Sequence, residues 1–183
     1  MAKSNGSGGG FGKVFLGFVL GIVVVVAGIA AYLQWGSPPV ATADKAFPFE
    51  RKIVSSLLDA RITRQTKTPP FGTSEDVYEG GAKVYMMECS ACHGTPGHDV
   101  RFAKYMYPAA PMLWKKHARG NVVGVSDDEA GVTYWKVANG IRLTGMPAFD
   151  HVLTDTQMWQ VTLLLKNADQ QLPDPVTKIL ATP

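Results

Sequence analysis

Residues 89–93 read C-S-A-C-H, a C-x-x-C-H motif that is typical of covalent haem attachment in c-type proteins. Cys89 and Cys92 lie three positions apart, on one helical turn, so each thiol can add to a vinyl group of the porphyrin. The next residue, His93, then presents an imidazole nitrogen to the iron as the proximal ligand. The motif therefore predicts one covalently bound haem c, attached through two thioethers and an axial histidine.

Two other uses of paired cysteines fit this sequence less well. A thioredoxin-type pair opens a helix within a βαβ pattern, whereas this pair closes a predicted helix. A structural zinc site needs four ligands, but the chain has only 2 cysteines, and three of its 4 histidines are scattered outside the motif. Haem attachment is therefore the preferred interpretation.

The composition fits a globular domain that carries a membrane segment. The chain has 183 residues, 46% of them hydrophobic, and a formal net charge of +3. Without Lys3 and Lys13, which precede the apolar segment, 16 of the 18 basic residues remain against 15 acidic ones. Nucleic-acid binding requires a concentrated basic face, and this balance gives no support for it.

An uncharged segment of 20 residues, 14–33, precedes the rest of the chain. As a helix it would span roughly 30 Å, the thickness of a bilayer hydrocarbon core. Lys3 and Lys13 lie on its N-terminal side, which places that side in the cytoplasm and the downstream domain outside. We therefore predict a flexible cytoplasmic N-terminus over 1–13, a single-pass anchor over 14–35 in a bacterial plasma membrane, and a periplasmic domain.

A cleaved signal peptide is the alternative to a retained anchor. Residues 41–43 read A-T-A, which has the small-x-small form of a cleavage site. The hydrophobic region of a signal peptide usually has about 7–15 residues, and this one is longer. The length favours the anchor.

A basic amphipathic helix is predicted at residues 48–66, within a juxtamembrane segment and linker that covers 36–72. Its apolar residues follow helical spacing: Phe49, Ile53, Val54, Leu57, Leu58 and Ile62. Its basic residues are Arg51, Lys52, Arg61 and Arg64. Such a helix could lie on anionic lipid headgroups, dock on a partner subunit, or pack on its own haem domain.

The haem domain is predicted over 73–172 and is all-α, because no segment shows persuasive strand-like alternation. Three helices are expected, at residues 77–88, 127–139 and 155–167. The first has N-cap candidates at residues 73–76, and the other two follow the capping-box patterns Ser126–Glu129 and Thr154–Gln157. Residues 173–183 are predicted to form a C-terminal tail.

The segment 99–119 is predicted to be a loop beside His93. Pro108 and Pro111 are candidates for a rigid wall there, and a carbonyl of this loop could accept the second N–H of the histidine. The loop also carries basic residues that could steer an acidic partner: Arg101, Lys104, Lys115, Lys116 and Arg119.

Three methionines are candidates for the sixth iron ligand: Met106, Met112 and Met146. Met146 lies between Gly145 and Pro147, which fix an irregular loop that can point a side chain inward. An isolated methionine often fills only a gap in a core, so spacing alone leaves the choice open.

From about Val77 to Ala168 the sequence resembles a class I cytochrome c. In that family a helix ends in C-x-x-C-H, and a loop methionine, often followed by proline and an aromatic residue, is the sixth ligand. The resemblance implies that Met146, in G-M-P-A-F, is the distal ligand opposite His93. It also implies that a C-terminal helix crosses the first helix at glycine, here Gly81 with Trp159.

Arg142, in the loop that precedes the predicted distal ligand, is a candidate partner for a haem propionate. A guanidinium can hold a carboxylate through two parallel hydrogen bonds. An ordinary solvated surface arginine is the alternative.

These features predict a monohaem electron carrier, not an enzyme, because iron with both axial positions filled has no open site for a substrate. Its partners would be the lipid bilayer and redox proteins at the membrane: a quinol-oxidising complex, a terminal oxidase or a periplasmic dehydrogenase. Two alternatives stay open. One is a fixed cytochrome subunit of a larger oxidoreductase complex, and the other is a haem sensor or enzyme with a labile sixth ligand.

Overall fold

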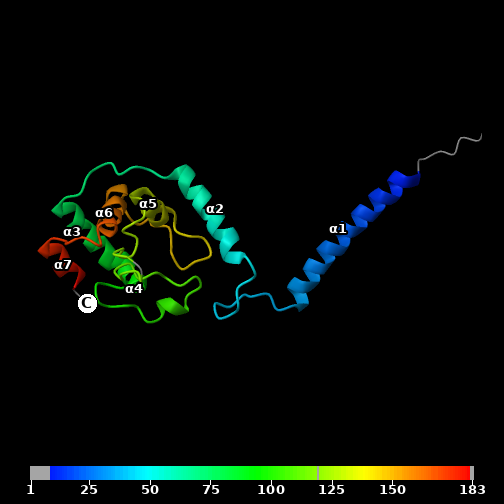
Figure 1. The fold of residues 1–183 in the computed structure, drawn as a ribbon, viewed down its shortest axis with the longest axis horizontal. Coiled ribbons are helices and arrows are strands. Elements are labelled where there is room, and N and C mark those ends of the chain that lie inside the picture. Colours follow the sequence, from blue (N-terminus) through cyan, green and yellow to red (C-terminus); the bar gives the residue numbers. More distant parts are fainter. Residues whose placement is uncertain (1–8, 119, 182–183) are drawn as a thin grey trace, which may run out of the picture. The chain divides into compact units, whose positions relative to one another are not determined.

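The regular secondary structure is entirely helical in residues 9–118 and 120–181, the part of the chain that this computed structural model describes (Figure 1). Within these ranges there is no strand, only two isolated bridges. The prediction of an all-α fold is confirmed. The chain divides into two compact units between Ala46 and Phe47.

The first unit contains one long helix, α1 (Gly9–Trp35, 27 residues). Its stretch from Gly10 to Trp35 is long and apolar enough to cross a membrane, judged by length and composition. The helix begins before the uncharged segment, so the prediction of a flexible N-terminus is wrong for residues 9–13. No proline interrupts this stretch, and an established helix extends at low cost per residue. Residues 1–8, including Lys3, lie outside the described part.

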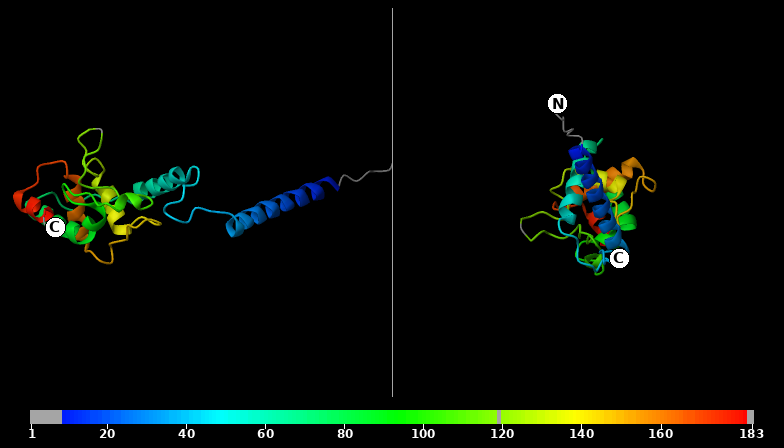
Figure 2. Two further views of the ribbon diagram at one scale, coloured as in Figure 1. Left: turned by 90° about the horizontal axis from the view of Figure 1, so that it is seen from below. Right: turned by 90° about the vertical axis from the view of Figure 1, so that its right-hand side faces the viewer.

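The second unit begins with α2 (Glu50–Gln65), which confirms the helix predicted at 48–66. Its C-terminal half is fixed to the rest of the unit. Ile62 is buried, and the Gln65 side-chain oxygen accepts a hydrogen bond from the Trp135 indole at 2.9 Å. In this unit α3 packs against α6 and α7, α6 packs against α5, and α5 packs against α2 (Figure 2).

The C-S-A-C-H motif ends a helical run that is longer than predicted. The run consists of α3 (Glu75–Val84), a π-helical turn η1 (Tyr85–Cys89) and α4 (Ser90–His93). Ser74 caps it by accepting a hydrogen bond from the Val77 amide at 3.3 Å. Within the π-turn the Ser90 amide bonds to the Tyr85 carbonyl. Such turns occur frequently at functional sites.

A short 3-10 turn, η2 (Ala103–Tyr105), interrupts the loop that follows, and α5 (Ala130–Asn139) comes next. This helix begins later than the predicted residue 127, so the capping box proposed for Ser126 and Glu129 is wrong. The Ser126 hydroxyl instead accepts a hydrogen bond from the Val123 amide at 3.1 Å, which stabilises a turn before the helix.

The chain ends in two helices, α6 (Asp155–Lys166) and α7 (Asp174–Leu180). The capping box of Thr154 and Gln157 is confirmed, with both of its hydrogen bonds present. The prediction of a tail over 173–183 is wrong for 174–180. Two apolar residues four positions apart, Val176 and Leu180, are buried in the core, and this spacing was overlooked in a short segment.

Gly81 allows α3 and α6 to cross at close range. A Cβ atom at this position would lie 2.4 Å from the Gln160 carbonyl oxygen and 3.0 Å from the Leu164 Cβ. The predicted crossing at Gly81 is therefore confirmed, but Trp159 does not make this contact. Its ring stacks on Tyr134, with the centroids 4.0 Å apart.

The crossing predicts opposite effects for two adjacent glycine substitutions. Gly81→Ala should lower the free energy of unfolding by about 1–3 kcal/mol, because the new methyl group meets backbone that cannot move aside. Gly80→Ala is the matched control. Its methyl group would meet only the flexible side chain of Gln160, and alanine is favoured over glycine in a helix by about 1 kcal/mol. Denaturant unfolding of the haem-loaded full-length protein in detergent, followed by circular dichroism, measures both; equal losses would contradict the close crossing.

Candidate haem site

The last turn of the long helical run brings both cysteines and His93 together. Cys89 and Cys92 are free thiols, each partly buried. Cys89 also packs against the main hydrophobic core. Two free thiols on one turn, followed directly by an imidazole, are the donor set that covalent haem attachment requires.

The environment of Cys89 argues against a redox-active dithiol. Burial, together with the neighbouring Glu88 and Cys92, raises the pKa of this thiol to about 12. The thiol therefore stays protonated at neutral pH in the folded protein. Reactive cysteines of the thioredoxin type depend instead on a lowered pKa.

The His93 ring is oriented by the loop that follows it. Its Nδ1 lies 2.8 Å from the carbonyl oxygen of Pro111. A carbonyl can only accept, so Nδ1 carries the proton and the lone pair of Nε2 is left for a metal ion. The Leu113 amide also donates to the His93 carbonyl at 3.2 Å. The predicted loop carbonyl is thus present, and Pro111 rather than Pro108 supplies it.

The turn after His93 is supported by two aromatic residues that the sequence analysis did not assign to the site, the buried Tyr85 and the partly buried Trp114. The Tyr85 hydroxyl donates to the Gly94 carbonyl at 2.6 Å, and burial raises the pKa of this phenol well above its usual value. The ring of Trp114 meets Tyr85 edge to face, with centroids 5.6 Å apart. Gly94 has a φ of 75°, and a Cβ there would lie 2.5 Å from the His98 carbonyl oxygen. In the sequence, the sign that Tyr85 faces the core is its position four residues after Gly81, on the same helix face.

Met146 lies in a loop whose backbone is tightly held. The Thr144 hydroxyl accepts a hydrogen bond from the Met146 amide at 3.1 Å and donates one to the Ile141 carbonyl at 2.7 Å. The Ile141 amide donates to the Met146 carbonyl at 3.3 Å. The Met146 side chain is partly buried and packs against the same core as Cys89.

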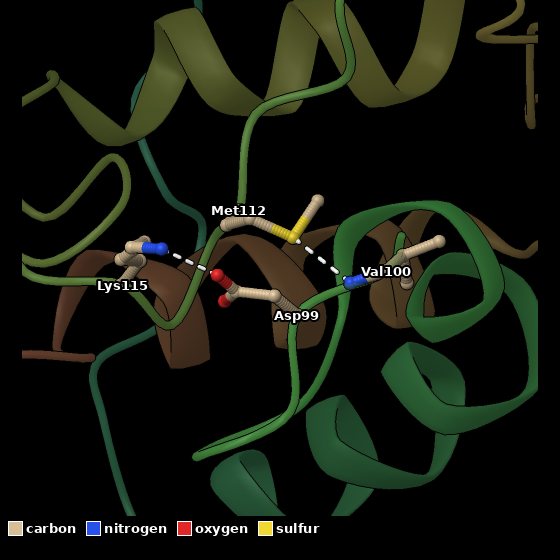
Figure 3. A network of polar contacts seen from close by, with 4 residues as sticks. All are labelled: Asp99, Val100, Met112 and Lys115. Carbon is tan, nitrogen blue, oxygen red and sulfur yellow. Dashed lines mark hydrogen bonds and ion pairs between the residues drawn. The ribbon is translucent and has the colours of Figure 1, made fainter. Parts of the chain in front are cut away.

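Met112 lies on the His93 side of the site. Its thioether sulfur accepts a hydrogen bond from the Val100 amide at 3.4 Å, next to the ion pair of Asp99 and Lys115 (Figure 3). It directly follows Pro111, which contacts the histidine. A sixth ligand must approach from the opposite face of a haem, so this position disfavours Met112.

Met106 lies close to the loop of Met146. A Cβ atom at Gly145 would be 2.5 Å from the terminal methyl group of Met106. Unlike Met146, its side chain is not among the described residues that pack against the main core. Of the three candidate methionines, Met146 therefore fits best, with Met106 as the spatial rival.

Arg142 belongs to the same loop and is exposed. It lines a groove with residues of α2 and α5, including Leu58 and Trp135. Its assignment to a haem propionate stays a prediction. In the described part of the chain no cluster of three or more His, Cys, Asp or Glu side chains could hold a separate metal ion.

Residues 76–164 match a protein-family model described as "Cytochrome C oxidase, cbb3-type, subunit III". This part of the chain is a c-type cytochrome domain. The match includes all the candidate haem residues and leaves α1, α2 and α7 outside. No curated protein matches the chain.

A cytochrome domain of this kind binds haem c covalently, and the donor set fits that cofactor. Two thiols lie on one turn, the imidazole already has its Nδ1 bonded, and a thioether lies in a fixed loop. Once bound, haem supplies a one-electron couple between ferric and ferrous iron. The chain supplies the attachment, the ligands and their orientation.

The Thr144 hydrogen bonds predict that this side chain positions Met146. Thr144→Val removes both hydrogen bonds at nearly constant volume. It should lower the free energy that holds the loop in its folded conformation by about 1 kcal/mol. We expect a weaker methionine-to-iron charge-transfer band in the oxidised protein and faster carbon monoxide binding in the reduced protein. Thr144→Ser keeps the hydroxyl and should restore both signals. A valine variant with an unchanged band would show that the hydroxyl does not position the ligand.

Proposed function

We propose that the protein is a membrane-anchored monohaem cytochrome that transfers single electrons between respiratory partners on the periplasmic face of a bacterial plasma membrane. Cys89 and Cys92 form the thioethers, and His93 and Met146 are the axial ligands. The observation that carries the proposal is the C-S-A-C-H turn, whose histidine already donates through Nδ1 to Pro111, within a c-type cytochrome domain.

The residues around the site favour electron transfer over substrate chemistry. An imidazole and a thioether together fill both axial positions and raise the reduction potential. Tyr85, which is buried, and Trp114, which is partly buried, pack together beside the turn after His93, and the backbone of Met146 is held by a hydrogen bond to Thr144. No open position on the iron is then left for a substrate.

Anchoring by α1 supports exchange with membrane proteins, because a tether raises the effective concentration of the haem near its partners. Such partners include a quinol-oxidising complex, a terminal oxidase or a periplasmic dehydrogenase. Arg101, Lys104 and Lys116 are exposed on the loop beside the histidine and could steer an acidic partner. Lys115 already pairs with Asp99, and Arg119 lies outside the described residues.

The axial assignment predicts different results for two methionine variants. Met146→Ala should abolish the methionine-to-iron charge-transfer band and make the reduced haem bind carbon monoxide readily, because a coordination position opens. Met106→Ala, from the neighbouring loop, should keep the band. Optical spectra of the purified full-length haem protein measure both. If the band survives in Met146→Ala and is lost in Met106→Ala, the distal ligand is Met106.

A second candidate is a fixed cytochrome subunit of a terminal oxidase, since the matching family model is described as an oxidase subunit. In that case α1 and α2 would be assembly surfaces. Native gels of membranes solubilised in mild detergent, stained for haem, distinguish the two. A free carrier should migrate as a lone 19.7 kDa chain in its micelle, whereas a fixed subunit should stay in a larger complex with additional haem.

A further inference from the structure

The N-terminal half of α2 presents a row of large apolar side chains to solvent. Ile53 and Leu57 lie four residues apart, on one face of the helix, and Phe49 directly precedes the helix as its N-cap residue, with a left-handed φ of 64°. Phe49, Ile53 and Leu57 are 75%, 57% and 67% exposed. We call these three residues the apolar row. A continuous exposed row of this kind marks an interaction surface.

The apolar row is not the face through which α2 packs on the cytochrome domain. That face contains Leu58, which is partly buried, Ile62, which is buried, and Gln65, which accepts the bond from Trp135. At about 100° per residue these positions lie on a different side of the helix from the row. The domain thus holds α2 in place while leaving Phe49 and Ile53 clear of it, and Leu57 lies at the edge of the groove towards α5.

The charges around the apolar row are predominantly basic. Between Glu50 and Gln65 the helix has four cations, Arg51, Lys52, Arg61 and Arg64, and two anions, Glu50 and Asp59. Within the described residues none of the four cations forms an ion pair. Arg51 lies on the far side of the helix from the row, whereas Lys52, Arg61 and Arg64 lie nearer to it, and Arg61 also donates a hydrogen bond to Gln65 at 3.4 Å. An apolar row with cations beside it is complementary to anionic lipid headgroups above acyl chains.

The length of the connector brings α2 within reach of the membrane. Only residues 36–49 separate the end of α1 from the start of α2. These 14 residues can span at most about 50 Å when fully extended. Of the helices in the second unit, α2 is the nearest along the chain to the anchor.

We propose that α2 is an interfacial helix, which lies on the bilayer surface with the apolar row among the acyl chains and its cations on the lipid phosphates. This inference rests on the proposed anchoring by α1. It gives the cytochrome domain a defined orientation, because α2 is fixed to α5 through Gln65 and Trp135. The groove beside α2 is also lined by Ile141 and Arg142, so the loop of Met146 is held next to the membrane-bound helix.

The test places spin labels on two faces of α2 in the full-length haem protein, reconstituted in phosphatidylcholine vesicles with and without phosphatidylglycerol. Ile53→Cys and Leu57→Cys report on the apolar row. Ser55→Cys is the matched control, because it is exposed on the same helix but off the row. We expect collisions with oxygen, relative to a water-soluble nickel chelate, to be several-fold more frequent at positions 53 and 57 than at 55. The difference should increase with the anionic lipid.

Washing the same vesicles with alkaline carbonate separates failure of this inference from failure of the proposed anchoring. If the protein is washed off, α1 is not an anchor and both proposals fall. If the protein stays but positions 53 and 57 are as open to nickel as position 55, only the interfacial helix is ruled out, and a protein partner covers the row. Dipolar broadening between labels would show that two copies meet at this face, which would also contradict the inference.

Discussion

The close contact between Gly81 and the Gln160 carbonyl determines how the haem-binding half of the domain is assembled. The helical run that begins with α3 and continues through η1 and α4 carries the cysteines and His93 at its far end, while α6 follows the loop of Met146. Because glycine has no Cβ, the two backbones approach until Leu164 also packs on α3. The packing of α3 on α6 therefore fixes how the parts of the chain that carry the candidate ligands His93 and Met146 lie relative to each other.

The helices give the site its frame, but the orientation of the ligand side chains depends on loops. The Pro111 carbonyl fixes the protonation and rotation of the His93 ring. On the other side, the Thr144 hydroxyl holds the backbone of Met146 by accepting a hydrogen bond from its amide. Both contacts come from segments without regular secondary structure, so each can be adjusted by substitution without disturbing the core. Such adjustment is one way in which a single domain type can serve different reduction potentials.

The sequence alone was sufficient wherever one short pattern determines the local structure. The C-S-A-C-H motif, the capping box at Thr154 and the glycine at the helix crossing are patterns of this kind. The box at Ser126 was misleading, because the serine hydroxyl forms a turn before α5 instead of capping the helix. The π-turn at Tyr85–Cys89 was not predicted, since its extra residue is accommodated by packing and leaves no composition signal. The helix α7 was not predicted because two apolar residues in a short segment are a weak pattern, and they become buried only through the contact of α7 with α3.

The burial of Cys89 has a consequence for the order of events during biosynthesis. Its thiol is partly buried because Cys89 packs against the main core, which includes residues of α6 and α7, and those helices are synthesised after the motif. A nascent chain that has reached only residue 93 lacks this core and exposes both thiols, whereas the completed fold partly buries Cys89 and raises the pKa of its thiol. The chemistry of thioether formation is therefore easiest on the incomplete chain.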